Sequence, residues 1–516
     1  MTRGRRWLIA GTIGLIITSA AAALVVHRAM RTVRPDILKT RVEQEISDRL
    51  HLDATIGALS VTLYPRAGIT GRRLELRVPN HPELPPFVSI DKFSVSATPR
   101  RLLHDIQTNH VELVSVEGLV ISVPAGQAKN GLVARSSADD ASSPVVVDRL
   151  TTKDAELRIL RAKPGQRPLV FHLHELDMTG LGFERPIAFH ATLTNPVPRG
   201  EVISDGTVGP WQSDPSDLPL AGTYTFRHAD LDTIRGIGGM LTSDGRYSGS
   251  VSKIRVVGTS NTPDFNLDFG GRPVPLSTQF TAVVDGANGT THLESVDATL
   301  FRTQVHVTGD VVNLPGPAGF DIRLQAAVRG GRIEDILRLA LDGRPPFSGA
   351  MLLSASIRVP AGETPVRDRL ELNGRFGLQQ VTFTDGDVER KLTELSRRGQ
   401  GKDPDAPAAP AVSNFLGDFQ LANGRMELED LAFTLPGAAV ELSGTYRLPT
   451  QTMAFEGQLR TEAVLSNVVG GFKSLFIKPF DWMFKHGGTG AVIPIAISGT
   501  REHPKFSVRM GAMLPK

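Results

Sequence analysis

Apolar and polar residues alternate with a period of two through most of the chain after residue 52. The clearest run is FDIRLQAAVR at residues 320–329, in which every second residue is apolar. These apolar residues are Phe320, Ile322, Leu324, Ala326 and Val328. Successive side chains of a β-strand point to opposite faces, so the run predicts a strand with one apolar face and one polar face. The same alternation places Met426, Leu428, Met453 and Phe455 on the apolar faces of two further predicted strands.

Asn-Gly and Asp-Gly pairs separate the alternating runs, as at 285–286, 288–289, 373–374 and 423–424. Such pairs are typical of tight hairpin turns, so the pattern predicts a mainly β fold built as an antiparallel meander. Two arrangements use this pattern. Two sheets can pack apolar face to apolar face in a sandwich, which the pattern alone favours, or one long sheet can curve so that its apolar face lines a groove.

Helical spacing is confined to a few segments. The sequence predicts helices over residues 35–51, 331–341 and 387–398. Flexible insertions rich in Gly, Pro, Ser and Asp are predicted at 125–143, 205–219 and 399–411.

Residues 7–26, WLIAGTIGLIITSAAAALVV, contain no charged side chain. As a helix, this length would cover the roughly 30 Å hydrocarbon layer of a bilayer, so the segment predicts a single membrane anchor. The apolar residues expected to contact lipid are Trp7, Leu8, Ile9, Leu15, Ile16, Ile17, Leu24, Val25 and Val26. Small residues at 19–23 also fit a cleaved signal peptide, but the apolar core is longer than is usual for a signal, which favours a retained anchor. Basic residues on both sides do not decide the orientation, and the cysteine-free body favours an N-terminus in the cytoplasm with the body in the periplasm.

A second apolar segment, residues 463–486, is the most aromatic part of the chain and has interleaved lysines. One interpretation is an amphipathic segment that contacts a membrane, and the other is a cap packed over the last strands. The membrane-contact candidates are Phe472, Phe476, Phe480, Trp482 and Phe484.

The composition and motifs of the chain limit the functions that it can have. The 516-residue chain has a net charge of only +3 and 6% aromatic residues, which makes nucleic acid a poor partner. It has no cysteine, and the common phosphate-binding, protease and hydrolase motifs are absent from it. His172 and His174 share a strand face, but a third ligand is not evident nearby, so they are interpreted as solvated side chains. We therefore expect no enzyme activity, no metal and no cofactor.

Two regions resemble the AsmA-like family of bacterial envelope proteins, relatives of TamB. In residues 52–124, the strand IGALSVTLYPRAGI (56–69) is followed by FVSIDKFSV (87–95), Leu102-Leu103 and VELVSVEGL (111–119). In the C-terminal part, GDFQLANGRMEL (417–428), FTLPGAAVELSGTY (433–446) and IPIAISGT (493–500) are similar to the family's C-terminal region. The resemblance covers about half of the chain and depends on the order and spacing of strands and turns.

The resemblance implies a curved, taco-like β groove that binds lipid, on an inner-membrane anchor with the body in the periplasm. It divides the chain into an anchor (1–34), an N-terminal β region (35–124), a central groove (125–398), a linker (399–411) and a C-terminal β region (412–516). The implied function is phospholipid transport to the outer membrane or its maintenance, with the membrane, phospholipid and an envelope protein as partners. The alternative is a periplasmic scaffold that assists outer-membrane protein assembly without carrying lipid. Groove candidates are Phe320, Ile322, Leu324, Val328, Met426, Leu428, Met453 and Phe455.

Overall fold

The structure is a computed structural model of the whole chain. It describes residues 35–50, 52–62, 67–79, 85–97, 110–123, 146–160, 168–181, 185–210, 217–268, 270–286, 289–314, 319–341, 343–384, 386–400, 402–403, 413–461, 491–500 and 503–508. The predicted anchor at 7–26, the aromatic segment at 463–486 and the insertion at 125–143 lie outside these ranges. No helix within the described ranges has both the length and the apolar character required to cross a membrane.

The prediction of a mainly β protein is confirmed. Across the described ranges, 24 strands belong to one mixed sheet, with a few short helices. The chain divides into two compact units, each described by itself below. Unit 1 comprises residues 1–233, 240–260 and 281–291, and unit 2 comprises 234–239, 261–280 and 292–516.

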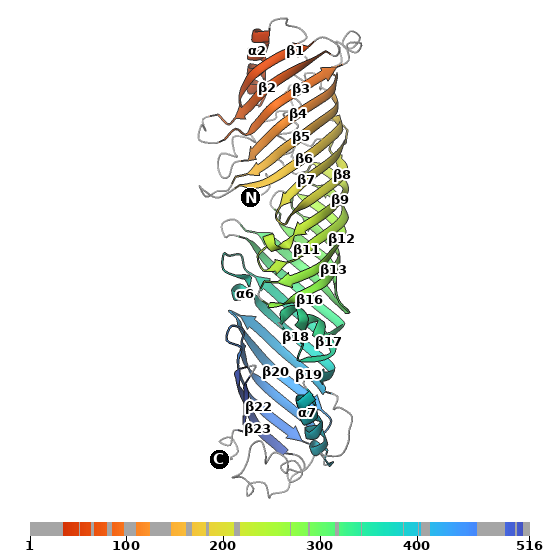
Figure 1. Ribbon diagram of the computed structural model, residues 1–516, viewed down its shortest axis with the longest axis vertical. Helices are drawn as coiled ribbons and strands as arrows, with labels where there is room; N and C mark the ends of the chain where they lie inside the picture. The colour runs from red at the N-terminus through yellow and green to blue at the C-terminus, as the bar shows by residue number, and fades with distance from the viewer. Residues whose placement is uncertain are drawn as a thin grey trace. The chain divides into compact units, whose positions relative to one another are not determined.

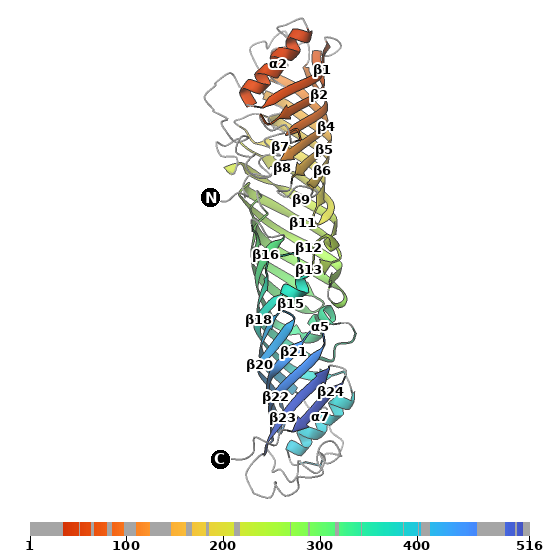
Figure 2. The same cartoon turned by 90° about the vertical axis from the view of Figure 1, so that its left-hand side faces the viewer.

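Unit 1 begins with one helix and continues with strands that pair in chain order (Figures 1 and 2). Its elements are α2 (Pro35–Leu50), β1 (Asp53–Thr62), β2 (Ala67–Arg77), β3 (Val88–Ala97), β4 (His110–Val123), β5 (Val146–Ile159), β6 (Leu169–Leu181), β7 (Ile187–Pro196), β8 (Arg199–Val208), β9 (Pro219–Asp230), the 3-10 turn η3 (Leu231–Thr233) and β11 (Met240–Ser250). The division between the units falls within β12 (Lys253–Leu267), β13 (Gly270–Val284) and β14 (Thr291–Leu300).

Unit 2 contains a long antiparallel meander, β15 to β24, interrupted by three helices. Its elements are β10 (Ile237–Gly238), β15 (Thr303–Asn313), β16 (Phe320–Arg332), α5 (Ile333–Ala340), β17 (Phe347–Val359), α6 (Val366–Arg369), β18 (Glu371–Phe383), α7 (Gly386–Gly399), β19 (Ser413–Ala422), β20 (Arg425–Leu435), β21 (Ala438–Arg447), β22 (Thr452–Thr461), β23 (Ala491–Thr500) and β24 (Pro504–Val508).

One of the strand pairs in the described part of the chain differs from the predicted antiparallel meander. β4 and β5 run parallel, with Val114 opposite Leu150. A parallel pair requires a connection that returns to the starting end of the first strand, and such crossovers take a dozen residues or more. The long connection at residues 124–145 meets this length requirement.

The helix predictions at 35–51 and 387–398 correspond to α2 and α7, whereas α5 begins two residues later than expected. Arg332 stays in β16 because Thr303 fixes it there. The Thr303 hydroxyl accepts from the Arg332 backbone N–H at 2.8 Å, and its one proton has two acceptors in reach, the Asp335 carboxylate at 2.9 Å and the Arg332 carbonyl at 3.2 Å. The insertion predicted at 205–219 is too long, since residues 205–208 complete β8 and Pro219 begins β9.

The main hydrophobic core of unit 1 lies along one face of β2 to β6. One row of side chains, opposite one another from strand to strand, is Ile69, Val95, Val114, Leu150 and Met178. Each of these is at most 4% exposed. Figure 2 shows α2 lying beside the first strands, where Val42 and Ile46 join the same core.

Glycine and aromatic residues oppose each other repeatedly across the strands. Gly71 faces Phe93, Gly206 faces Phe189, Gly374 faces Phe419, Gly417 faces Phe376 and Gly444 faces Phe455. At each of these glycines, a Cβ atom would come close to the facing ring, within 3.1 Å of a Phe376 carbon in the case of Gly417. Each ring therefore fills the space of the missing side chain, which is a known way to stabilise glycine within sheets.

Candidate functional site

Side chains on one face of β15 to β23 form continuous apolar rows across unit 2. We call this surface the C-terminal apolar face. Its central row runs through directly opposed residues of neighbouring strands: Val307, Ala326, Ala355, Gly374, Phe419, Leu428, Gly444, Phe455 and Ile497. A parallel row runs through Gly309, Leu324, Ile357, Leu372, Leu421, Met426, Tyr446 and Met453. At about 4.8 Å between strands, each row extends on the order of 35 Å.

Much of this face remains partly accessible to solvent. Leu324, Phe419, Leu428 and Phe455 are all half-buried, whereas the N-terminal rows of unit 1 are sealed. Because apolar surface left in water is unfavourable, a half-exposed row of this length is a candidate binding surface.

The opposite face of the same strands carries ion pairs, and it also carries the exposed apolar side chains Leu352, Leu416 and Val492. The Arg375 guanidinium donates two hydrogen bonds to Asp418 on the neighbouring strand, at 2.6 and 2.8 Å. This pairing lowers the pKa of Asp418. Arg460 likewise forms a 3.3 Å ion pair with Glu441. The ion pairs therefore lie on one side of the sheet, and the two continuous apolar rows lie on the other.

Two helices cover one end of the strands in unit 2. α5 packs against β17, and its Ile333 and Ile336 contact a cluster that includes Val328 and Met351, each 2% exposed. α7 packs against β18 and β21 through Leu392 and Leu395 (Figure 1). The helices therefore seal one margin of the apolar face, and the half-buried residues lie beyond that margin.

The structure brings most of the predicted groove residues onto this one face. Ile322, Leu324, Met426, Leu428, Met453 and Phe455 are half-buried members of the face. Val328 is buried near α5, and Phe320, at the end of β16, is 42% exposed. The five membrane-contact candidates and the nine anchor residues fall outside the described residues, so the structure does not place them.

Sequence reasoning missed an aromatic cluster on the C-terminal apolar face. Phe347 lies 5.9 Å from Phe383 and 6.1 Å from Phe415, and Phe415 lies 4.5 Å from Phe433, measured between ring centroids. The sequence signal for this cluster lies in runs such as NFLGDFQL at 414–421. Phe415 and Phe419 are an even number of residues apart there, so a strand would place them on one face.

In unit 1, four hydroxyl groups lie on the face that continues from the apolar core. Tyr224 hydrogen-bonds Ser243 at 3.1 Å, and Tyr247 hydrogen-bonds Ser204 at 2.7 Å. Burial raises the pKa of both tyrosines, against the opposing effect of the serine hydrogen bonds. The hydroxyls satisfy one another, so this stretch of β8 to β11 presents rings and glycines without unpaired polar groups.

His172 and His174 lie on the exposed polar surface of β6. His172 Nδ1 is 3.4 Å from Glu156, and His174 Nε2 is 2.7 Å from the Thr194 hydroxyl. Within the described ranges, no cluster of three metal-binding side chains is found.

Comparison with known proteins gives no information on the function of this chain. No family model, curated protein or solved structure matches this chain.

Proposed function

We propose that this protein binds the acyl chains of lipids along the C-terminal apolar face and holds them there away from water. The observation that supports this most is the pair of continuous, half-buried apolar rows from β15 to β23. Each CH₂ group that moves from water onto such a surface gains about 0.8 kcal/mol when fully buried. A surface of this kind needs no specific polar contact to hold a hydrocarbon chain.

In the proposed arrangement the sheet curves into a groove whose concave side is this apolar face. The uncharged segment at 7–26 anchors the chain in the bacterial inner membrane, and the body lies in the periplasm. There the protein supports phospholipid transport to the outer membrane, or the maintenance of that membrane. The sequence resemblance to AsmA-like proteins supports this placement.

The test uses a matched pair of substitutions on one strand. Leu324 belongs to the apolar face and is half-buried, while the adjacent Gln325 is exposed on the polar face. The full-length chain is transferred from the membrane into an amphiphilic polymer, and bound phospholipid is counted by native mass spectrometry. Wild type and Gln325→Asp should retain phospholipid, and Leu324→Asp should lose most of it.

Two results would overturn the proposal. One is wild-type protein that holds no phospholipid under these conditions, which would favour a scaffold that works without lipid. The other is equal lipid content in the Leu324→Asp and Gln325→Asp variants, both shown by circular dichroism to be folded.

A further inference from the structure

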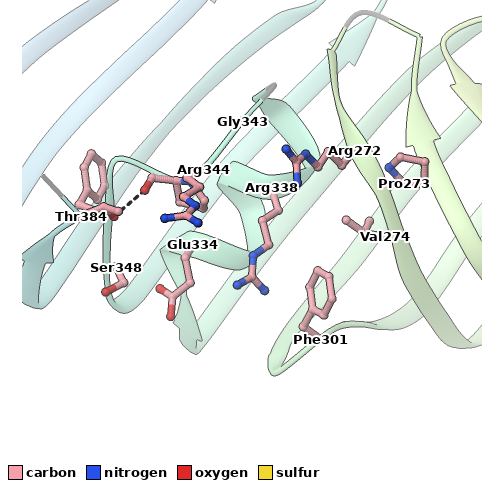
Figure 3. Close-up of a pocket in the computed structure, with 12 residues that line it drawn as sticks. Arg272, Pro273, Val274, Phe301, Glu334, Arg338, Gly343, Arg344, Ser348 and Thr384 are labelled. Atoms are coloured by element: carbon pink, nitrogen blue, oxygen red, sulfur yellow. Dashed lines mark hydrogen bonds between the residues drawn. The ribbon is translucent and has the colours of Figure 1, made fainter.

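A pocket of about 570 Å³ in unit 2 lies beside α5 (Figure 3). It is lined by the start of β13, the turn between β14 and β15, α5, the loop before β17 and the end of β18. Three of its lining residues are arginines: Arg272, Arg338 and Arg344. The walls between them are largely apolar and include Phe301, Phe347 and Val274.

The positive charge of the pocket exceeds its negative charge. Among the lining residues that the structure describes, Glu334 is the one carboxylate. It accepts hydrogen bonds from Arg332 at 2.8 Å and from the Gly349 backbone N–H at 3.1 Å. Burial tends to raise the pKa of Glu334, but these hydrogen bonds outweigh burial and the pKa is lowered, so the carboxylate is ionised and already paired at neutral pH.

The three arginines differ in whether their guanidinium groups already have an interaction partner. Arg338 lies over the Phe301 ring at 5.1 Å and is 3.9 Å from Asp335. Arg272 and Arg344 are exposed and form no ion pair or hydrogen bond with any described residue. A guanidinium group offers a planar set of N–H donors that matches the oxygens of a phosphate, so these two side chains are available to bind one.

Backbone geometry brings Arg272 to α5. Gly271 has a φ of +83°, and a Cβ atom there would overlap the Leu339 carbonyl oxygen at the end of the helix. Only glycine allows β13 to approach α5 this closely. Figure 3 shows the Arg272 side chain near α5, above Arg338 in this view.

The pocket is continuous with the C-terminal apolar face through Phe347. This ring lines the pocket and also packs with Phe383 and Phe415 in the apolar cluster of β17 to β19. A cationic pocket and an apolar surface therefore meet at one side chain.

We propose that this pocket binds the phosphate of a phospholipid headgroup while the acyl chains of that lipid lie on the C-terminal apolar face. The proposal rests on the proposed function, because it assigns the polar end of the same ligand. Arg272 and Arg344 supply the new contacts, and Arg338 adds positive charge from its place over Phe301.

The experiment compares two double variants of the full-length chain in an amphiphilic polymer. Arg272→Gln/Arg344→Gln removes both unpaired guanidinium groups of the pocket. Arg227→Gln/Arg246→Gln removes two exposed arginines of β9 and β11 in unit 1 and serves as the control. Three probes are titrated: monomeric lysophosphatidylglycerol, an uncharged alkyl glucoside of equal chain length, and inorganic phosphate.

Wild type and the control should bind the lysophospholipid more tightly than either other probe. The pocket variant should bind the lysophospholipid about tenfold more weakly for each arginine removed, with unchanged alkyl glucoside binding. If both amphiphiles bind but the pocket variant behaves like wild type, the pocket proposal is wrong and the acyl-chain proposal stands. If neither amphiphile binds to wild type, the proposed function itself fails. Inorganic phosphate binding as tight as lysophospholipid binding would identify a free-phosphate site and overturn the headgroup assignment.

Discussion

The two units use the same alternating strands but leave their apolar faces in different states. In unit 1, Val114 and Leu150 are at most 1% exposed in the middle of a sealed row. In unit 2, Leu324 and Leu428 belong to continuous apolar rows but are only half-buried. Alternation alone therefore produces an apolar face, and what packs on that face determines whether it acts as core or as a binding surface. Two kinds of substitution test this difference, and two more test the glycine–aromatic pairs and the ion pairs of unit 2.

The largest effect should come from a charge placed in the sealed row. Leu150→Asp would bury a carboxylate among aliphatic side chains with no partner, at a cost of several kcal/mol. We expect loss of cooperative unfolding of unit 1, measured by urea titration with circular dichroism. Leu324→Asp, on the accessible face, should lower the unfolding midpoint far less. Similar losses in both variants would mean that the two faces are equally closed.

Leucine-to-alanine substitutions should show the same difference between the two units, with smaller losses of stability. Leu150→Ala should cost about 2–5 kcal/mol, as is usual for a fully buried leucine. Leu428→Ala should cost roughly half as much or less, because part of that side chain is already in contact with water. Differential scanning calorimetry of the two variants would measure both values. A larger loss at Leu428 than at Leu150 would contradict the comparison.

The opposed glycine and aromatic residues should tolerate little added volume. In Gly374→Ala, the new methyl group would overlap the Ser354 carbonyl oxygen and press on the Phe419 ring. We expect about 1–3 kcal/mol of destabilisation, which is typical of overpacking. Gly386 is a suitable control because a Cβ atom there meets no atom within 4 Å. Thermal unfolding should separate the two variants, and equal midpoints would show that the ring does not need the space above Gly374.

The smallest effect concerns the polar face of unit 2. Arg375 lowers the pKa of Asp418, so the stabilisation from this pair is present above the unfolded carboxyl pKa of about 4 and is lost as pH falls through the lower folded value. Arg375→Gln should therefore be slightly less stable than wild type at neutral pH, with the difference disappearing in acid. Urea midpoints between pH 2.5 and 7 would show this, with Arg329→Gln as a control on exposed arginine. If the urea midpoints of wild type and Arg375→Gln differed by the same amount at every pH, the ion pair with Asp418 would not be the cause.

The sequence was sufficient to predict the faces of individual strands, because a period of two is a local property. Residues 322–329 show the predicted alternation, with Arg323, Gln325 and Arg329 more exposed than their neighbours. The prediction is wrong at the start of β16, where Asp321 is 2% exposed and Phe320 is 42% exposed. Met426, Glu427 and Leu428 are all half-buried, so exposure does not alternate there.

The parallel β4–β5 pair could not be read in this way, since alternation does not encode strand direction. The predicted start of α5 was wrong because the Arg332 backbone N–H donates a tertiary hydrogen bond to Thr303, which holds Arg332 in the sheet. The half-buried state of Leu324 was likewise unpredictable, as it depends on which other segments cover the strand.

The most direct test of acyl-chain binding uses two adjacent positions of β22. Phe455 lies on the C-terminal apolar face, and Glu456 is exposed on the reverse side. A photo-crosslinking benzoylphenylalanine is placed at each position in turn in cells that express the full-length chain, and the adducts are identified by mass spectrometry after irradiation. We predict phospholipid adducts through their acyl chains at position 455 and none at position 456. Equal lipid labelling at both positions, or protein adducts alone at position 455, would contradict binding of lipid to this face.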